Sequence, residues 1–317
     1  MARLPVGVIG VGALGQHHAR HLARSEDAEL VGVHDIDPAR GQAVASRVGT
    51  RFFAEVDQLL ERVEAVTIAV PTPAHTEVGL RAIDRGCSVL LEKPMAASLA
   101  DADRLLAAAA RHGVQLQVGH VERFNRAIRA ARPYLGELRY FESTRLAPFQ
   151  PRGTDVAVVL DLMIHDLDLI LHLTGSASVA DLRASGVAVL TEHLDVANAR
   201  VEFETGAAAT ITSSRVARDR VRKLRMFQPD GYFSLDLALG SGVFMRLKNG
   251  RGPGVASSLE DLVETIPLEA PELDALGLEL QTYVRSVKGH AEHVVTGAEG
   301  RAALALALDV SRAVRGS

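Results

Sequence analysis

Short apolar runs of strand length alternate with stretches of helical periodicity along the first 120 residues. The pattern predicts strands at Pro5–Ile9, Leu30–Asp35, Val66–Val70, Ser88–Leu91 and Val114–Val118, and helices at Gly15–Ser25 and Leu99–His112. Alternation of this kind is typical of a parallel sheet with helices on both faces. We therefore expect a doubly wound α/β domain at the N-terminus.

The pattern changes after residue 121, where strand patterns follow one another with turn residues between them. The predicted strands are Glu137–Thr144, Val187–Leu190, Val196–Phe203, Ala207–Ser213, Arg222–Phe227, Tyr232–Leu237 and Val243–Leu247. Helices are predicted at Val159–Leu173, Leu273–Lys288 and Glu299–Val314. Neighbouring strands with few helices favour a mostly antiparallel open sheet. We therefore predict two domains, residues 1–121 and residues 122–317, the second also of the α/β class.

Composition and charge exclude several classes of protein. The 317 residues suit two domains, and 47% hydrophobic with 23% charged residues is the balance of a soluble globular protein. A net charge of −4 provides no basic field for nucleic acid, and no apolar run is long enough to span a membrane. Cys87 is the only cysteine and no signal peptide precedes the first strand, so we expect a cytoplasmic protein without disulfides.

A glycine pattern follows the first strand directly and opens the first helix. Gly10, Gly12 and Gly15 form G-x-G-x-x-G, which permits a tight turn and close approach of the main chain to a pyrophosphate. Asp35 lies 20 residues beyond Gly15, where its carboxylate can accept both hydroxyls of an adenosine ribose. The alternative is that the glycines serve only a turn and that Asp35 only ends a strand. The combination predicts a Rossmann site for NAD, with NADP disfavoured by Asp35 and that preference weakened by Arg40 nearby.

Further candidates for the cofactor lie at the carboxyl edge of the predicted sheet, where such sheets bind ligands. Ala13 and Leu14 stand between the glycines, and Pro71, Thr72 and His75 follow a buried strand. We assign all five residues to the cofactor site. For His75 a structural role is an equal alternative, because a histidine at the start of a helix is often structural.

Two elements carry candidate catalytic chemistry. Glu92-Lys93-Pro94 follows another buried strand, and the proline restricts the Lys93 backbone to extended conformations. Asp161 and His165 are four residues apart on an otherwise apolar helix, so they share one face. A carboxylate one turn from an imidazole can fix its tautomer or raise its basicity, as a base that oxidises an alcohol requires. Taken singly, Lys93 could be a solvated loop residue, and Asp161 with His165 a structural pair.

In this order and spacing, the glycine pattern, Glu92-Lys93-Pro94 and Asp161-x-x-x-His165 resemble the Gfo/Idh/MocA oxidoreductase family over essentially the whole chain. The resemblance implies oxidation or reduction of a ring carbon of a sugar, inositol or nucleotide sugar, without a metal. It also implies that Lys93 and His165 are the catalytic pair and that Asp161 supports the substrate or the histidine. Glu92 would then approach the nicotinamide ribose.

The segment Gly119–Phe124 resembles the crossing between domains in that family, and we place its His120 and Arg123 at the substrate with Lys93, Asp161 and His165. No metal site is expected. The first helix does carry three histidines, which lack cysteine partners and are interpreted as polar helix positions: His17, His18 and His21.

Basic residues crowd one stretch of the second domain: Arg215, Arg218, Arg220, Arg222, Lys223 and Arg225. They could form a solvated strand flank, a clamp for a phosphate or diphosphate, or, with least support, a nucleic-acid site. We choose Arg215 and Arg222 as the first candidates for substrate binding. The segments Gly119–Asn125, Asp161–Leu169 and Ser213–Phe227 resemble the family branch that acts on UDP-N-acetylglucosamine, which implies a nucleotide sugar. A free-sugar or inositol dehydrogenase and a catalytically silent NAD-binding sensor are the alternatives.

The expected antiparallel sheet also bears on assembly. If helices back one face, the other face needs cover, and exposed apolar area of that size favours a partner. We therefore predict a homodimer or homotetramer packed through the sheets of the second domain, with neither nucleic acid nor a membrane as a partner.

Overall fold

The computed structural model describes residues 2–150, 156–248, 259–290, 292 and 294–315. The chain forms two compact units, residues 1–121 with 273–304 and residues 122–272 with 305–317. The first crossing between units follows Val121, at the predicted boundary, but residues 273–304 group with the N-terminal part of the chain. The assignment of cofactor binding to residues 1–121, and of substrate binding and assembly to residues 122–317, stays a prediction.

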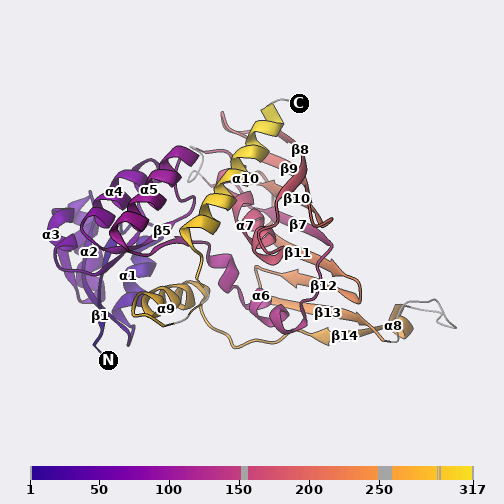
Figure 1. Cartoon of the computed structure of the whole chain (residues 1–317), viewed down its shortest axis with the longest axis horizontal. Helices are drawn as coiled ribbons and strands as arrows, with labels where there is room; N and C mark the ends of the chain where they lie inside the picture. The colour runs from indigo at the N-terminus through magenta and orange to yellow at the C-terminus, as the bar shows by residue number, and fades with distance from the viewer. Residues whose placement is uncertain (1, 151–155, 249–258, 291, 293, 316–317) are drawn as a thin grey trace. The chain divides into compact units, whose positions relative to one another are not determined.

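The strands of the first unit, drawn in indigo to purple in Figure 1, form a six-stranded sheet. Its order is β3-β2-β1-β4-β5-β6, and all its strands are parallel. The strands are β1 Leu4–Ile9, β2 Ala28–His34, β3 Arg51–Phe53, β4 Ala65–Ile68, β5 Ser88–Glu92 and β6 Leu116–Gly119. The order reverses between β1 and β4, and ligands of such sheets bind outside the carboxyl ends of the strands at that point. This is the predicted Rossmann fold.

Helices flank this sheet: α1 Gly15–Ala23, α2 Pro38–Val48, α3 Val56–Leu60, α4 Thr72–Asp84, α5 Leu99–His112 and α9 Ala275–Val287. Helix α5 has the predicted ends, with the Ser98 hydroxyl accepting from the Asp101 amide and Gly113 in the left-handed region. Helix α9 explains why residues 273–304 belong to this unit. Its Tyr283 is fully buried in the same core as β1 and donates its hydroxyl to the main-chain oxygens of Val66 and Ser88.

The second unit is built on an eight-stranded sheet with the order β14-β13-β12-β11-β7-β10-β9-β8. The strands are β7 Tyr140–Leu146, β8 Val179–Val187, β9 Val196–Phe203, β10 Ala208–Ser214, β11 Val221–Gln228, β12 Gly231–Asp236, β13 Ser241–Leu247 and β14 Val263–Pro267. Among the described strands of this sheet only the pair β7–β10 is parallel, so the prediction of a mostly antiparallel sheet is confirmed.

Short helices accompany this sheet: α6 Arg126–Ala131, α7 Ile164–Leu173 and α8 Leu259–Leu262, with 3-10 turns at Val121–Phe124 and Arg132–Tyr134. The last helix, α10 Gly297–Arg315, contributes residues to both units. Along β7 and β9, buried positions alternate with partly exposed ones. One face of the sheet is therefore the core of the unit, and the other face is more open to solvent.

Two predicted elements of the second unit differ from the structure. Of the run Val187–Leu190 only Val187 is in a strand, as the last residue of β8, because the Val189 and Leu190 amides donate to the buried Asp195 carboxylate and the chain turns there. The strand instead lies earlier, at β8. The helix predicted at Val159–Leu173 begins as a π turn, Val159–Met163, before α7.

The described helices include none with the length and apolar character needed to cross a membrane. Within the same residues, no group of three or more His, Cys, Asp or Glu side chains is arranged to hold a metal ion.

Candidate active site

The glycine turn after β1 has the geometry that a dinucleotide pyrophosphate requires. Gly10 has φ 82°, in the left-handed region, and a Cβ on Gly15 would lie 1.8 Å from the Gly10 oxygen. A Cβ on Gly12 would instead meet nothing within 4 Å, so this stretch of main chain has open space beside it. Ala13 and Leu14 are exposed, and α1 begins at once with its amides toward this loop. The turn therefore fits the negative charge of a pyrophosphate at a helix N-terminus.

Asp35, directly after β2, already has a full set of hydrogen-bond partners. Its carboxylate accepts from the Val11 amide at 2.8 Å and the Asp37 amide at 2.9 Å. It also accepts a two-pronged bond from Arg40, with Nε at 3.0 Å and Nη2 at 2.6 Å. Burial alone would raise the pKa of Asp35, but Arg40 and the two amides hold it below its usual value. Ribose hydroxyls could reach this carboxylate only by displacing Arg40, whose side chain is 44% exposed.

The loop after β4 and the start of α4 contain three predicted cofactor residues. Pro71 is exposed and Thr72 is the first residue of α4. His75 is buried, with Nδ1 2.9 Å from the Pro94 oxygen and Nε2 2.9 Å from the Val70 oxygen. Both ring nitrogens therefore lie at main-chain carbonyls, which supports the structural alternative for His75. Its contact with the cofactor stays a prediction.

Glu92-Lys93-Pro94 begins at the last residue of β5, again at the carboxyl edge. Lys93 is partly exposed between buried Glu92 and buried Pro94, and the Lys93–Pro94 peptide is cis. The Glu92 carboxylate lies inside the unit, with Oε1 3.1 Å from Nε2 of His18 on α1. This partner was not predicted from the sequence. The signal was available, because Gly15, His18, Ala19 and Leu22 have the helical spacing of a core-facing stripe.

Asp161 and His165 lie in the second unit, whereas Lys93 lies in the first. Asp161 is within the π turn and His165 is in the first turn of α7, so the α-helical spacing assumed for the pair does not hold there. Both side chains are nevertheless partly exposed in a largely buried stretch, which places them on the accessible side. A π turn inside a helix is frequent at functional sites. The geometry is therefore compatible with a role for both residues at a ligand.

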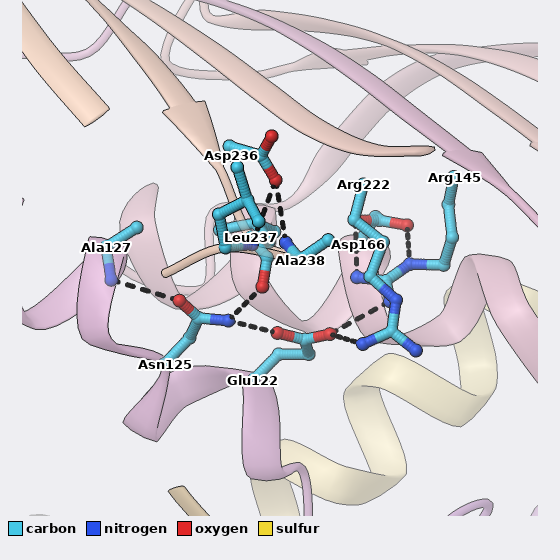
Figure 2. A network of polar contacts seen from close by, with 10 residues as sticks. Glu122, Asn125, Ala127, Arg145, Asp166, Arg222, Asp236, Leu237 and Ala238 are labelled. Atoms are coloured by element: carbon cyan, nitrogen blue, oxygen red, sulfur yellow. Dashed lines mark hydrogen bonds and ion pairs between the residues drawn. The ribbon is translucent and has the colours of Figure 1, made fainter. Parts of the chain in front are cut away.

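Figure 2 shows a network of polar contacts that includes Asp166, the residue that follows His165 in the sequence. The buried Arg145 binds Asp166 through Nε at 2.7 Å and Nη2 at 3.1 Å, and Glu122 through Nη1 at 2.9 Å. Arg222, 38% exposed, lies 3.4 Å from the same Glu122 oxygen, and Asn125 donates to the other one at 2.9 Å. Burial alone would lower the pKa of Arg145, but the charges of Asp166 and Glu122 hold it above its usual value.

The remaining predicted substrate residues are buried. Arg123 donates to Asp168 at 2.6 and 2.8 Å, and Arg215 donates to the Val156 oxygen at 2.7 Å. His120, after β6, is 1% exposed. These contacts favour a role for both arginines in holding the fold together. Their binding of substrate, and that of His120, stays a prediction.

Comparison with known proteins gives consistent results over the whole chain. Residues 4–120 match the GFO/IDH/MocA oxidoreductase family with an NAD-binding Rossmann fold, and residues 127–234 match the GFO/IDH/MocA C-terminal domain. UDP-N-acetylglucosamine 3-dehydrogenase from Acidithiobacillus ferrooxidans is 38% identical, over 99% of this chain and 98% of that protein. Its solved structure, GnnA, covers 100% of this chain and 99% of its own with a TM-score of 0.91 and 37% identity. Myo-inositol 2-dehydrogenase from Thermotoga maritima is 26% identical over 95% of this chain and 93% of that protein.

Proposed function

Because this chain belongs to the GFO/IDH/MocA oxidoreductase family, we propose that it is an NAD-dependent dehydrogenase of a sugar or nucleotide sugar. The reaction transfers hydride between a ring carbon bearing a hydroxyl and nicotinamide, and the best substrate is UDP-N-acetylglucosamine or a close relative. The observation that carries this proposal is the 38% identity with a UDP-N-acetylglucosamine 3-dehydrogenase over 99% of the chain.

The glycine turn, Pro71, Thr72 and Asp35 are the residues that would hold the cofactor. The open space at Gly12 and the N-terminus of α1 suit the pyrophosphate, and the buried Asp35 suits the adenosine ribose. When bound, nicotinamide supplies the acceptor or donor of the hydride. NAD is preferred over NADP, because a 2′-phosphate would meet the Asp35 carboxylate.

Three side chains of this protein act on the reacting hydroxyl in the proposal. His165 accepts the hydroxyl proton, and Asp161 orients the substrate or the imidazole. Lys93 places its ammonium group where negative charge develops on the oxygen, which lowers the barrier more than it strengthens ground-state binding. A sensor that only binds NAD would need none of these three residues.

The network around Arg145 supports a diphosphate in the substrate. Burial and then the Arg145 charge lower the pKa of Arg222, Glu122 opposes them, and the exposed Arg220 adds a smaller effect in the same direction as Arg145. Within the network the cations Arg145 and Arg222 balance the carboxylates Glu122 and Asp166, so the cations that a ligand can reach are the partly exposed Arg222 and the exposed Arg220. We assign Arg220 and Arg222 to the diphosphate, since guanidinium forks suit phosphate oxygens.

The test compares reduction of NAD with UDP-N-acetylglucosamine, free N-acetylglucosamine and myo-inositol. Lys93→Met and His165→Gln should each lower kcat about 10²–10⁴-fold while the Kd for NAD changes little. Arg222→Ala should raise KM for the nucleotide sugar about ten- to a hundredfold, at 1.5–3 kcal/mol per charge-assisted contact. Arg225→Ala is the matched control, because Arg225 lies on the same strand but is exposed and paired with Glu142.

Each alternative has its own result in the same assay. Activity on a free sugar or on myo-inositol equal to that on the nucleotide sugar, with no effect of Arg222→Ala, would identify a free-sugar or inositol dehydrogenase. The likeness to myo-inositol 2-dehydrogenase is the observation that favours this second candidate. Binding of NAD without turnover of any substrate, unaffected by Lys93→Met, would indicate a sensor.

We also propose that two or four copies assemble through the open face of the eight-stranded sheet. Three aromatic side chains on this face are partly exposed: Tyr140, Phe227 and Tyr232. The ring centroid of Phe227 lies 5.7 Å from that of Tyr140 and 5.4 Å from that of Tyr232. Aromatic side chains of this kind are enriched in interfaces between proteins. Light scattering at micromolar concentration should report a dimer or tetramer, and a monomer would contradict the proposal.

A further inference from the structure

The Glu92 carboxylate is directed into the first unit. Glu92 pairs with Gly119 of the neighbouring strand β6, and a Cβ at Gly119 would lie 2.9 Å from the Glu92 Oε1 atom. Glu92 is only 7% exposed. The absence of a side chain at Gly119 therefore makes room for a carboxylate that is folded back over the sheet and withdrawn from solvent.

A buried carboxylate is costly unless charge and hydrogen bonds compensate it. His18, fully buried on α1, lies 3.1 Å from Glu92 Oε1, and the Lys93 amide donates to Oε2 at 3.2 Å. Burial alone would raise the pKa of Glu92, but His18 and then Lys93 hold it below its usual value. Glu92 is thus ionised at neutral pH, and it joins α1 to the main chain of Lys93.

A second buried histidine holds the other side of the same lysine. His75 on α4 contacts the Pro94 oxygen through Nδ1 and the Val70 oxygen through Nε2. Burial lowers the pKa of His75, and these two carbonyls and the Glu92 charge oppose that effect. The main chain is therefore fixed immediately before Lys93 by the pair His18–Glu92 and immediately after it by His75.

We infer that His18 is a positioning residue for Lys93 and acts through the Glu92 carboxylate. The inference rests on the proposed function, in which Lys93 acts on the reacting hydroxyl. His18 touches neither substrate nor the hydroxyl in this account. Its part is to keep Glu92 charged and in place, so that the lysine main chain, and with it the ammonium group, has one position.

Kinetics of variants separate positioning from a merely structural role. His18→Leu and Glu92→Gln should each lower kcat about ten- to a hundredfold, the cost of a small misplacement, with KM for the sugar within about threefold. The double variant should be no slower than the slower single one, because both changes break one link. His18→Gln should recover most of kcat, since its amide keeps an N–H donor for Glu92.

The matched control is His17→Leu, because His17 is the adjacent residue of α1 and is partly exposed. It should leave kcat, KM and the Kd for NAD near their original values. Equal kcat in His18→Leu, Glu92→Gln and the unmodified protein would overturn the inference. So would a fully additive double variant.

A second measurement does not depend on turnover. Lysine occurs at only four positions, 93, 223, 248 and 288, so reductive methylation with ¹³C-formaldehyde gives few NMR signals. The Lys93 signal is identified by its loss in Lys93→Arg. It should shift in His18→Leu and in Glu92→Gln but not in His17→Leu, and a signal that stays in place in the first two variants would overturn the inference. An unmodified protein that is inactive on every sugar would count against the proposed function alone, and the NMR comparison would still decide the role of His18.

Discussion

Two aspartate–arginine forks, one in each unit, have nearly the same chemistry and opposite surroundings. In the first unit Arg40 donates to Asp35 at 2.6 and 3.0 Å, and in the second Arg145 donates to Asp166 at 2.7 and 3.1 Å. The Arg40 side chain is 44% exposed, whereas that of Arg145 is 3% exposed. Bond lengths do not separate the two pairs, but access of water to the arginine does.

The difference in exposure determines what each pair can do. An exposed arginine can leave its carboxylate at small cost because water replaces the lost bonds, so Arg40 can give way to a ligand at Asp35. Water cannot replace the bonds of Arg145 in this way, because both Asp166 and Glu122 would be left charged and buried. The first fork is therefore suited to a binding site and the second to fixing the frame that holds α7 and its His165.

Arg145→Met gives the largest expected effect. It should lower the free energy of unfolding by about 3–5 kcal/mol, since it leaves the buried Asp166 without a cation and the buried Glu122 with only the partly exposed Arg222. Urea denaturation at pH 7 measures it. Arg139→Met is the control, because Arg139 pairs with Glu137 at the surface and should change stability by less than about 1 kcal/mol.

The same fork allows a sharper version of that experiment. Replacing Arg145, Asp166 and Glu122 together by apolar side chains of similar volume should restore most of the stability, because no buried charge then remains unpaired. If Arg145→Met alone lowered the free energy of unfolding by less than about 1 kcal/mol, the buried Asp166–Arg145 pair would not differ in stability from the exposed Asp35–Arg40 pair, and the comparison would fail.

Sequence patterns predicted the parts of this fold whose cause is local. The glycine turn and the strands β1 and β5 follow from short apolar runs and from residues within a few positions of one another. Arg145 was missed because its partner Asp166 is 21 positions away, so nothing near it in the sequence shows that it is paired. Strict alternation along β7 does place Arg145 on the buried face with Phe141 and Ser143, and that was the available signal.

Two other segments also differ from their predicted structure for reasons that the local sequence pattern does not show. The apolar run Val187–Leu190 has strand composition, yet Val189 and Leu190 are more than half exposed because their amides serve the buried Asp195. The π turn at Val159–Met163 leaves no trace in apolar periodicity. For the site, Lys93, Asp161 and His165 came from motif order, whereas the part of His18 required knowledge of which buried side chain meets Glu92.

Asp195 supplies the next largest effect, as a buried carboxylate that relies mainly on amides. Burial alone would raise its pKa, but the amides of Leu190, Thr191 and Val189 and the Thr191 hydroxyl lower it to about 2. A carboxyl whose pKa falls on folding stabilises the protein above its unfolded pKa and loses that contribution as pH falls toward the folded one.

Asp195→Asn should therefore lower the free energy of unfolding by about 1–3 kcal/mol at pH 7. The difference from the original protein should shrink as pH falls from about 4 to 2, because the carboxyl of the original protein then becomes protonated. Thermal unfolding across that range measures it. The exposed Asp181, paired with Arg183, is the matched control as Asp181→Asn, and equal curves for both variants would contradict the interpretation.

The cofactor preference tests whether the first fork opens. We expect tighter binding of NAD than of NADP, and Arg40→Ala should widen the ratio of the two Kd values about tenfold. The reason is that NAD loses a competitor for Asp35 while NADP loses a cation for its 2′-phosphate. Asp35→Ser should narrow the ratio. Fluorescence titration with both cofactors measures it, and equal or stronger binding of NADP by the unmodified protein would refute the preference.

The smallest expected effect is that of Arg40→Met on stability, and it bears most directly on the contrast between the forks. Loss of an exposed partner should lower the free energy of unfolding by only about 0–1 kcal/mol at pH 7. Asp35 keeps the Val11 and Asp37 amides, so its charge is not left unsatisfied. Because Arg40 helps to hold the pKa of Asp35 below its usual value, the difference should shrink as pH falls from about 4 toward that lowered pKa, where the carboxyl becomes protonated. Urea denaturation at pH 7 and pH 3 measures both values. A loss at pH 7 as large as that of Arg145→Met would mean that Asp35 depends on Arg40 as a buried charge does, and the first fork could not open for a ligand.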